Sequence, residues 1–183
     1  MVGDLEDGVG RLQAIVAELR RFAHPHPGLD EAIEVDGLVG SVLRFMSHEL
    51  KDGARVELDL APGHVITGNR NKLLQVLINL VQNAVYAVRK RASENGEGTI
   101  RIASRTVGET DELTVRDNGV GIAPEHVSKI FEPFFTTKDV GEGMGLGLSI
   151  CYRIIEEHGG RISVQSEPGQ FTEFTLALPR KPL

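Results

Sequence analysis

The order of helical and extended periodicities along the chain constrains its fold more than any other feature. Apolar residues with helical spacing predict a long helix over about 69–91, which either Asn69 or Asn71 could cap. The helices and strands expected around it do not alternate regularly, so a parallel βαβ sheet is disfavoured. We expect an α+β fold, a two-layer α/β sandwich with helices on one face of a mixed, mostly antiparallel sheet.

The bounds of the other elements follow from periodicity and from the Gly, Pro and Asn turns between them. We expect helices over 124–130 and over 146–158. A further helix is expected from Asp36, whose side chain could cap it. The buried face of this helix would carry Leu38, Val42, Leu43 and Phe45. The predicted strands are 55–60, 64–67, 99–107, 112–116, 161–166 and 171–178.

The first 29 residues are expected to form a separate unit. Apolar residues recur there at spacings of four and three, at Leu5, Val9, Leu12, Val16 and Leu19. This a/d seam favours a helix that pairs with another helix, and an amphipathic helix lying on its own domain is the alternative. Two prolines and a glycine within 24–28 end it. We therefore divide the chain into 1–29, a helix plus linker, and 30–183, the main domain.

Composition and charge argue against several classes of protein. The formal net charge of −6 and the 5% of aromatic residues disfavour a nucleic-acid partner. The acidic start and the lack of a long apolar run predict neither a signal peptide nor a membrane span, so we expect a cytoplasmic chain, compatible with a membrane-anchored parent. A single cysteine, Cys151, excludes a disulfide framework and is expected to be a small buried residue.

Two polar motifs interrupt the apolar pattern. Asn79 and Asn83 share one face of the long helix, where amide oxygens suit Mg²⁺; two ordinary surface asparagines are the alternative. The run 117–122, Asp-Asn-Gly-Val-Gly-Ile, follows a predicted strand. There a carboxylate can accept a hydrogen bond from an amino group, and glycines let a flat ring approach the backbone, although a plain turn has the same composition.

Two further motifs follow. The run 131–138 holds three phenylalanines, a candidate anchor for a mobile loop, and Lys138, a candidate phosphate contact. Core packing of at least one phenylalanine is the alternative. The run 141–150 is rich in glycine and opens a helix, where backbone N–H groups attract phosphate. It matches neither the Walker nor the Rossmann pattern, so alone it is weak evidence.

In this order, the four motifs resemble the N, G1, F and G2 boxes in the ATP-binding catalytic domain of sensor histidine kinases, which belong to the GHKL superfamily. The motifs occupy 79–150, and the resemblance extends over about 36–179. It implies a kinase domain with ATP and Mg²⁺ as cofactors. It also implies that Asn83 is the magnesium ligand, supported by Asn79 one helical turn earlier.

The same resemblance assigns the remaining roles. Asp117 would bind the adenine amino group, Gly119 and Gly121 would line the base pocket, and Thr172 matches a family threonine near the water of the adenine site. The glycines of 143–147 would cradle the phosphates under a flexible lid. The residues implied to bind ATP are Asn79, Asn83, Tyr86, Asp117, Gly119, Gly121, Ile122, Thr137, Lys138, Gly143, Met144, Gly145, Leu146, Gly147, Leu148 and Thr172.

Position 79 separates the branches of the superfamily. The DNA gyrase B, MutL and heat-shock chaperone branches carry a Glu there that activates water. Asn79 is a poor general base, which favours transfer to another acceptor over hydrolysis. Tyr86 departs from the pattern, because many histidine kinases have a basic residue at its position. Lys138, Arg89 and Lys90 are candidates for the cation that completes the phosphate clamp.

The phosphoacceptor histidine is not expected in this chain. The run 47–51 resembles a His-Glu-x-x-x-Pro box, but Gly53 stands at the Pro position and a strand is predicted immediately afterwards, so we reject His48. The segment 1–29 would then be a remnant of the second helix of a dimerisation hairpin. We expect a catalytic fragment that transfers the ATP γ-phosphoryl to a His on an absent dimerisation domain. A response regulator receiver domain would be the next partner, and the parent protein would be a homodimer in a two-component phosphorelay.

Two other functions stay open. One is a non-catalytic nucleotide-sensing interaction module, and the other is an ATP hydrolase like gyrase or MutL. Supplying an acceptor domain would separate a kinase from a sensing module. Steady-state phosphate release would reveal a hydrolase.

Overall fold

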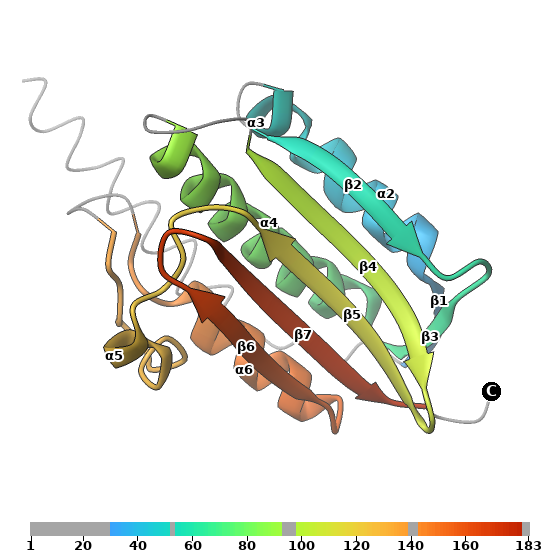
Figure 1. Cartoon of the computed structure of the whole chain (residues 1–183). Coiled ribbons are helices and arrows are strands. Elements are labelled where there is room, and N and C mark those ends of the chain that lie inside the picture. Colours follow the sequence, from blue (N-terminus) through green and yellow to red (C-terminus); the bar gives the residue numbers. More distant parts are fainter. Residues whose placement is uncertain (1–29, 52–53, 93–97, 139–142, 181–183) are drawn as a thin grey trace, which may run out of the picture.

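The structure of this chain is a computed structural model that describes residues 30–51, 54–92, 98–138 and 143–180 (Figure 1). Its elements are, in order, β1 (Glu31–Glu34), α2 (Val35–Phe45), α3 (Ser47–Lys51), β2 (Arg55–Leu60), β3 (Val65–Gly68), α4 (Arg70–Ala92), β4 (Thr99–Val107), β5 (Thr110–Asp117), α5 (Pro124–Val127), α6 (Gly147–Glu157), β6 (Arg161–Glu167) and β7 (Phe171–Pro179). The predicted heptad helix lies outside the described residues, so the division into 1–29 and 30–183 stays a prediction.

Five strands form the main sheet, in the order β2-β4-β5-β7-β6. β2 runs parallel to β4, and the other three pairings are antiparallel. The predicted mixed, mostly antiparallel sheet is therefore confirmed. β1 and β3 pair with each other as a separate antiparallel sheet. β1 was not predicted, because its four residues bury only Ile33 and carry too short an alternation to stand out.

The helices α2, α4 and α6 cover one face of the main sheet, which makes the predicted two-layer sandwich (Figure 1). The core lies between the layers, where alternate strand residues such as Ile100, Leu113 and Leu176 are buried together with Leu77 and Leu80 of α4. Burying one such side chain stabilises the fold by about 1.5–3 kcal/mol. This packing holds α4 and the ends of the strands in fixed positions relative to one another.

The start of α4 is fixed both by a cap and by contacts with α6. Asn69 is the cap, because its Oδ1 accepts a hydrogen bond from the Lys72 backbone N–H at 3.1 Å. The Asn69 backbone N–H donates to Nε2 of His158, 2.9 Å away, at the end of α6. Lys72 also pairs with Glu157 at 2.8 Å. The first turn of α4 therefore lies against the last turn of α6, so the two helices are antiparallel.

Three local predictions are wrong. Asp36 lies in the first turn of α2 and does not cap it; the cap residue is Glu34, whose side chain makes no capping hydrogen bond. Phe45 was expected on the buried face, but it is 69% exposed at the last residue of α2, beyond the sheet-facing stripe. The helix that begins at Pro124 was expected to reach 130 but ends at Val127, after which the Lys129 N–H donates to the His126 carbonyl three residues back, as in a tighter turn.

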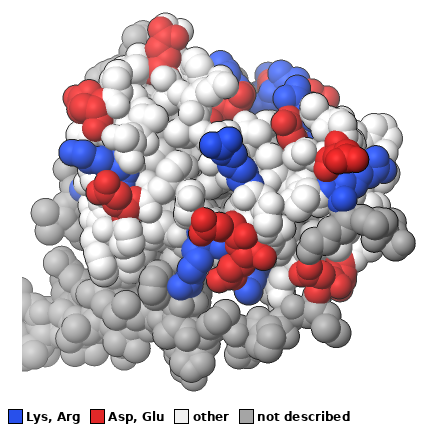
Figure 2. Space-filling view, turned by 90° about the horizontal axis from the view of Figure 1, so that it is seen from below, with Lys and Arg blue, Asp and Glu red and all other residues white. Residues whose placement is uncertain are grey.

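The outer face of the main sheet is polar. Cross-strand ion pairs join Arg101 to Asp59, Arg105 to Glu112 and Arg116 to Glu173. Acidic and basic side chains are also intermixed on the face of the molecule seen in Figure 2. In the part of the chain that the structure describes, none of the helices has both the length and the apolarity to cross a bilayer.

Candidate functional site

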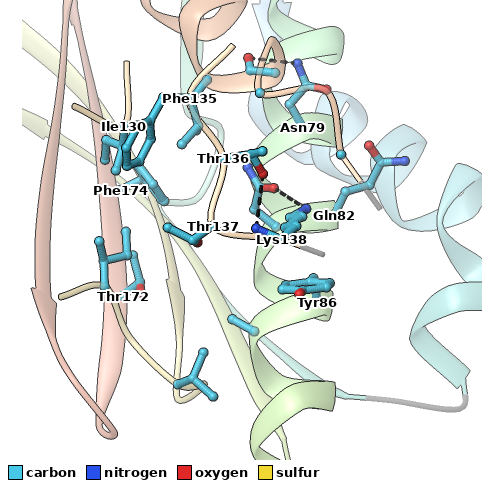
Figure 3. A pocket seen from close by; sticks show the side chains of 18 of the residues that line it. Asn79, Gln82, Tyr86, Ile130, Phe135, Thr136, Thr137, Lys138, Thr172 and Phe174 are labelled. Atoms are coloured by element: carbon cyan, nitrogen blue, oxygen red, sulfur yellow. Dashed lines mark hydrogen bonds between the residues drawn. The ribbon is translucent and has the colours of Figure 1, made fainter. Parts of the chain in front are cut away.

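A cavity of about 340 Å³ opens between α4, the loop after β5, the segment 135–138 and the start of α6 (Figure 3). Nearly all the residues predicted to bind ATP line it, namely Asn79, Asn83, Tyr86, Asp117, Gly121, Ile122, Thr137, Lys138, Gly143, Met144, Gly145, Leu146, Gly147, Leu148 and Thr172. Residues separated by up to 93 positions in the sequence are thus brought together around one space.

Seven lining residues were missed by sequence reasoning: Gln82, Ala87, Val120, Ile130, Phe135, Thr136 and Phe174. Two signals could have found two of them. Gln82 lies three residues after Asn79, and so shares its helical face. Phe174 lies two residues after Thr172 on β7, and so points to the same side of the sheet.

The side of the cavity formed by α4 carries the two predicted asparagines. Asn79 Nδ2 donates to the Gly147 carbonyl oxygen at 3.3 Å and lies 3.7 Å from Cys151 Sγ. Cys151 is fully buried, as predicted, and burial raises the pKa of its thiol to about 12. Asn83 points its Oδ1 at Lys138, whose Nζ donates to it at 2.9 Å. The helix therefore presents one asparagine to α6 and the other to a cation.

The carboxyl group of Asp117 is at the end of β5 and is almost completely buried. The Gly119 backbone N–H donates to its Oδ1 at 2.8 Å. Burial raises the pKa of this carboxyl group to about 7, although the Gly119 N–H, the Arg116 charge and a backbone hydrogen bond from Thr172 act in the opposite direction. Asp117 is thus held in one orientation and changes its protonation state close to neutral pH.

Gly119 does not line the cavity, contrary to the prediction. It lies directly against α4, where a Cβ atom would come within 2.5 Å of the Ala87 backbone carbon. The backbone N–H of the next residue, Val120, donates to the Ala87 carbonyl oxygen at 3.3 Å. The glycine is needed because the loop after β5 passes against the helix, and this close approach brings Asp117 and Gly121 to the cavity.

The phenylalanine segment divides into two roles. Phe131 packs against Phe174 and Tyr152, and Phe135 lines the cavity, so the expectation that at least one phenylalanine packs in the core is confirmed. Phe134 is instead 70% exposed and has a φ of 68°. Its backbone N–H donates to the Gly145 carbonyl at 2.9 Å, which joins this segment to the glycine-rich run.

Of the three cations considered for the phosphate clamp, Lys138 alone lines the cavity as the structure describes it. Its Nζ lies 4.5 Å from the centroid of the Tyr86 ring. Lys90 lies farther from the same ring, at 5.8 Å. Arg89 is not among the lining residues, and its guanidinium group donates to the Glu49 carbonyl at 2.7 Å. The geometry therefore favours Lys138.

The histidines that the structure describes form no cluster typical of a metal site. His48 is exposed on the short helix α3, and β2 begins at Arg55. Among the described residues, no group of three His, Cys, Asp or Glu side chains could hold a metal ion. A hard cation is better matched by the amide oxygen of Asn83, which faces the cavity and already accepts a hydrogen bond from an ammonium group.

Comparison with known proteins agrees with this site. Residues 68–182 match the family described as histidine kinase-, DNA gyrase B- and HSP90-like ATPase. The chain is 33% identical over 172 residues to the sensor histidine kinase ZraS of Escherichia coli K12, covering 92% of this chain and 35% of ZraS. It is 36% identical over 173 residues to the C4-dicarboxylate transport sensor protein DctB of Rhizobium meliloti, covering 93% and 26%. The chain thus spans about a third and a quarter of these relatives.

Solved structures show the same architecture. The catalytic domain of the histidine kinase ThkA is 30% identical and superposes with a TM-score of 0.70, covering 85% of this chain and all of that domain. Full-length ShkA in complex with AMPPNP is 27% identical with a TM-score of 0.76, covering 92% of this chain and 35% of ShkA. The chain therefore belongs to the family of histidine kinase-, DNA gyrase B- and HSP90-like ATPases, as a histidine kinase catalytic domain.

Proposed function

We propose that this domain binds Mg·ATP in the cavity and transfers the γ-phosphoryl group to a histidine on a separate dimerisation domain. The observation that carries the proposal is the convergence of three kinds of group on one cavity. Asp117 supplies a buried carboxyl group, Asn83 an amide oxygen, and 143–147 a glycine-rich backbone before α6. These groups suit the adenine amino group, a divalent cation and phosphate oxygens respectively.

Base recognition would fall to Asp117 and its surroundings. Because the backbone N–H groups of Gly119 and Thr172 hydrogen-bond to it, the carboxyl group has a fixed orientation, and its oxygens, with about four lone pairs between them, can still accept from an amino group. The apolar lining residues Val120, Ile122 and Ile130 would contact the faces of the ring. Thr172 lies opposite Asp117 in the β5–β7 register, and its Oγ1 lies 3.2 Å from Ser166 Oγ.

Magnesium, when bound, would supply positive charge to neutralise the phosphate oxygens. Asn83 would hold it through Oδ1, because a neutral oxygen ligand leaves the other positions of the ion to phosphates and water. Lys138 and the backbone N–H groups of 143–147 would add to the electrostatic stabilisation of the transferring group. In phosphoryl transfer this positioning and charge stabilisation account for most of the catalysis.

The cavity favours transfer over hydrolysis. Asp117 is the only carboxyl group among the described residues that line it, and its Oδ1 already accepts the Gly119 N–H. Position 79, where a general base would activate water, holds an amide that donates to Gly147. A water molecule beside the phosphates would therefore have no carboxylate from the described lining residues to take its proton.

The relatives support the wider setting of the proposal. ZraS is named a sensor histidine kinase, and ShkA was solved with AMPPNP, a nonhydrolysable ATP analogue. We infer that the parent of this domain acts as a homodimer, that it passes its phosphoryl group to a response regulator receiver domain, and that the catalytic domain works in the cytoplasm. The segment 1–29 would be part of the dimerisation hairpin plus the linker.

Phosphotransfer to a supplied acceptor tests the proposal. The chain is incubated with γ-labelled ATP, magnesium and a histidine-containing dimerisation domain, and a second reaction contains the dimerisation domain with its histidine replaced by glutamine. We expect acid-labile label on the first acceptor, none on the second, and little free phosphate without acceptor. Rapid steady-state phosphate release with no label on the acceptor would instead indicate a hydrolase.

A further inference from the structure

Among the described residues, Lys138 contacts its own segment, helix α4 and the glycine-rich run. Its backbone N–H donates to Thr136 Oγ1 at 3.1 Å, which fixes the start of the side chain. Its Cδ passes so close to Gly143 that a Cβ there would lie 3.1 Å away. Its Nζ donates to Asn83 Oδ1 at 2.9 Å and lies 4.5 Å from the centre of the Tyr86 ring. Figure 3 shows Lys138 beside Tyr86 on the α4 side of the cavity.

The ring of Tyr86 gives the ammonium group a surface that suits a cation. An ammonium group within about 6 Å of an aromatic centroid is attracted by the negative face of the ring. Tyr86 is one helical turn beyond Asn83, so ring and amide oxygen contact the ammonium from adjacent positions of one helix face. Tyr86, a neutral residue on α4, thus helps to hold the positive charge of Lys138 in the cavity, although Lys138 belongs to another segment.

The same contact occupies the oxygen that a magnesium ion would need. Asn83 Oδ1 has two lone pairs, but a divalent ion bound to it would lie close to the Lys138 ammonium, and the two positive charges would repel each other, so the two cations compete for one atom. The flexible stem of a lysine lets its charge move to a nearby anion without rearranging the backbone. Phosphate groups beside Asn83 would offer the displaced ammonium such an anion.

We propose, on the basis of the nucleotide site described above, that Lys138 is an exchangeable internal cation. In the nucleotide-free domain it holds the Asn83 oxygen. When Mg·nucleotide enters, it yields that oxygen and turns to the phosphates, with Tyr86 as its platform. Lys138 therefore sets how strongly nucleotide affinity depends on magnesium, and Tyr86 acts as its positioning residue.

Calorimetry with ADP tests this dependence in the whole chain. The quantity compared is the magnesium gain, the ratio of the ADP dissociation constants without and with magnesium. Lys138→Met should raise this gain about tenfold over the unmodified chain, the lower range for a hydrogen bond to a charged group. The reason is that the Lys138 ammonium would be the main side-chain charge facing the phosphates of metal-free ADP, whereas in Mg·ADP the metal ion neutralises most of the phosphate charge. Loss of Lys138 should therefore weaken metal-free ADP more than Mg·ADP. Tyr86→Leu should raise the gain by a smaller factor.

Lys129→Met is the matched control, because Lys129 is exposed and lies outside the cavity. It should leave the magnesium gain unchanged. If the magnesium gain of Lys138→Met equals that of the unmodified chain, the inference is overturned, while the nucleotide site itself stands. Absence of ADP binding by the unmodified chain would instead count against the proposed function itself.

Nuclear magnetic resonance gives a second readout that does not require a stable Lys138 variant. In the nucleotide-free chain, the Lys138 ε-methylene protons should be shifted upfield by the Tyr86 ring relative to those of Lys129. Tyr86→Leu should abolish this shift, and Mg·ADP should change it in the unmodified chain. An unshifted Lys138 signal, or one that Mg·ADP leaves unchanged, would contradict the exchange.

Discussion

Asn79 joins the two helices that flank the cavity, because its Nδ2 donates to the Gly147 carbonyl oxygen 3.3 Å away at the first turn of α6. The other end of the same helix pair is fixed by Asn69 and His158. The amide at position 79 therefore holds the glycine-rich run against α4, next to Asn83. Asn79 therefore has a structural role in addition to the implied one of supporting the magnesium ligand Asn83.

Removing this link should weaken both stability and phosphate binding. Asn79→Ala loses a half-buried hydrogen bond, so we expect the free energy of unfolding to fall by about 1 kcal/mol. ADP affinity should fall more than adenosine affinity, because the displaced glycine-rich run would contact phosphates and not the base. Urea unfolding and calorimetry measure these effects. Asn71→Ala, at an exposed position of the same helix, is the control. Equal loss for ADP and adenosine would exclude this role.

The raised pKa of Asp117 predicts a pH-dependent stability. Its folded-state value of about 7 lies above the ordinary 3.8, so the folded state binds an extra proton between these values and loses stability as pH rises through them. Between pH 6 and pH 8 the loss attributable to Asp117 is about 1.4 kcal/mol.

Asp117→Asn has no carboxyl group at this position, so it escapes this loss. Its free energy of unfolding minus that of the unmodified chain should therefore increase as pH rises from 6 to 8. Urea unfolding of both chains across that range measures the difference, with the shared titration of other groups cancelling. A difference that stays constant, or that shrinks with pH, would show that the Asp117 pKa is not raised.

The same substitution should change base specificity. In Asp117→Asn the amide oxygen would accept the Gly119 N–H and leave its NH₂ group facing the cavity, where it would meet the adenine amino group donor to donor. We expect ADP affinity to fall about tenfold or more. Inosine diphosphate carries a carbonyl oxygen at that position, so its affinity should rise relative to ADP. Calorimetry with both nucleotides measures the ratio, and an unchanged preference for ADP would refute the role of Asp117.

Asn83→Ala should abolish the effect of magnesium and leave base recognition intact. Without the amide oxygen, ADP dissociation constants measured with and without magnesium should become equal, while adenosine binding stays as in the unmodified chain. The Asn71→Ala variant again serves as the control. A magnesium effect that survives in Asn83→Ala would mean that another group holds the ion.

The close approach of Gly119 to α4 can be tested by adding one methyl group. In Gly119→Ala the Cβ would collide with the Ala87 backbone, so we expect stability to fall by about 1–3 kcal/mol. Gly37→Ala is a matched control, because nothing lies within 4 Å of its Cβ position in α2. That control should be neutral or stabilising, since alanine favours helix. Equal thermal unfolding of the two variants would contradict the packing.

Much of the fold could be predicted because single segments carried clear periodicities. α4, β4 and β7 were located to within about two residues, since each has a long apolar pattern with end signals such as Asn69. β1 was missed because pairing with β3, and not its own pattern, makes it a strand. Phe45 was placed on the buried face because helical spacing relates it to Leu38 and Val42, but it is the last residue of α2 and is 69% exposed, which no local pattern encodes.

The site was predictable as a set of residues but not as a set of contacts. The four motifs contain most of the lining residues, whereas Gly119 proved to contact α4. The bond from Lys138 to Asn83 joins positions 55 apart, and the buried pair of His64 and Asp111 joins positions 47 apart. Such contacts depend on how the elements pack, so periodicity and spacing within a segment could not indicate them.

Calorimetric titration of the chain with a nonhydrolysable ATP analogue, with and without magnesium, tests the central claim most directly. The account predicts saturable binding with one site per chain, tightened by magnesium and competed by ADP. Absence of binding under both conditions would contradict the assignment of the cavity as a nucleotide site.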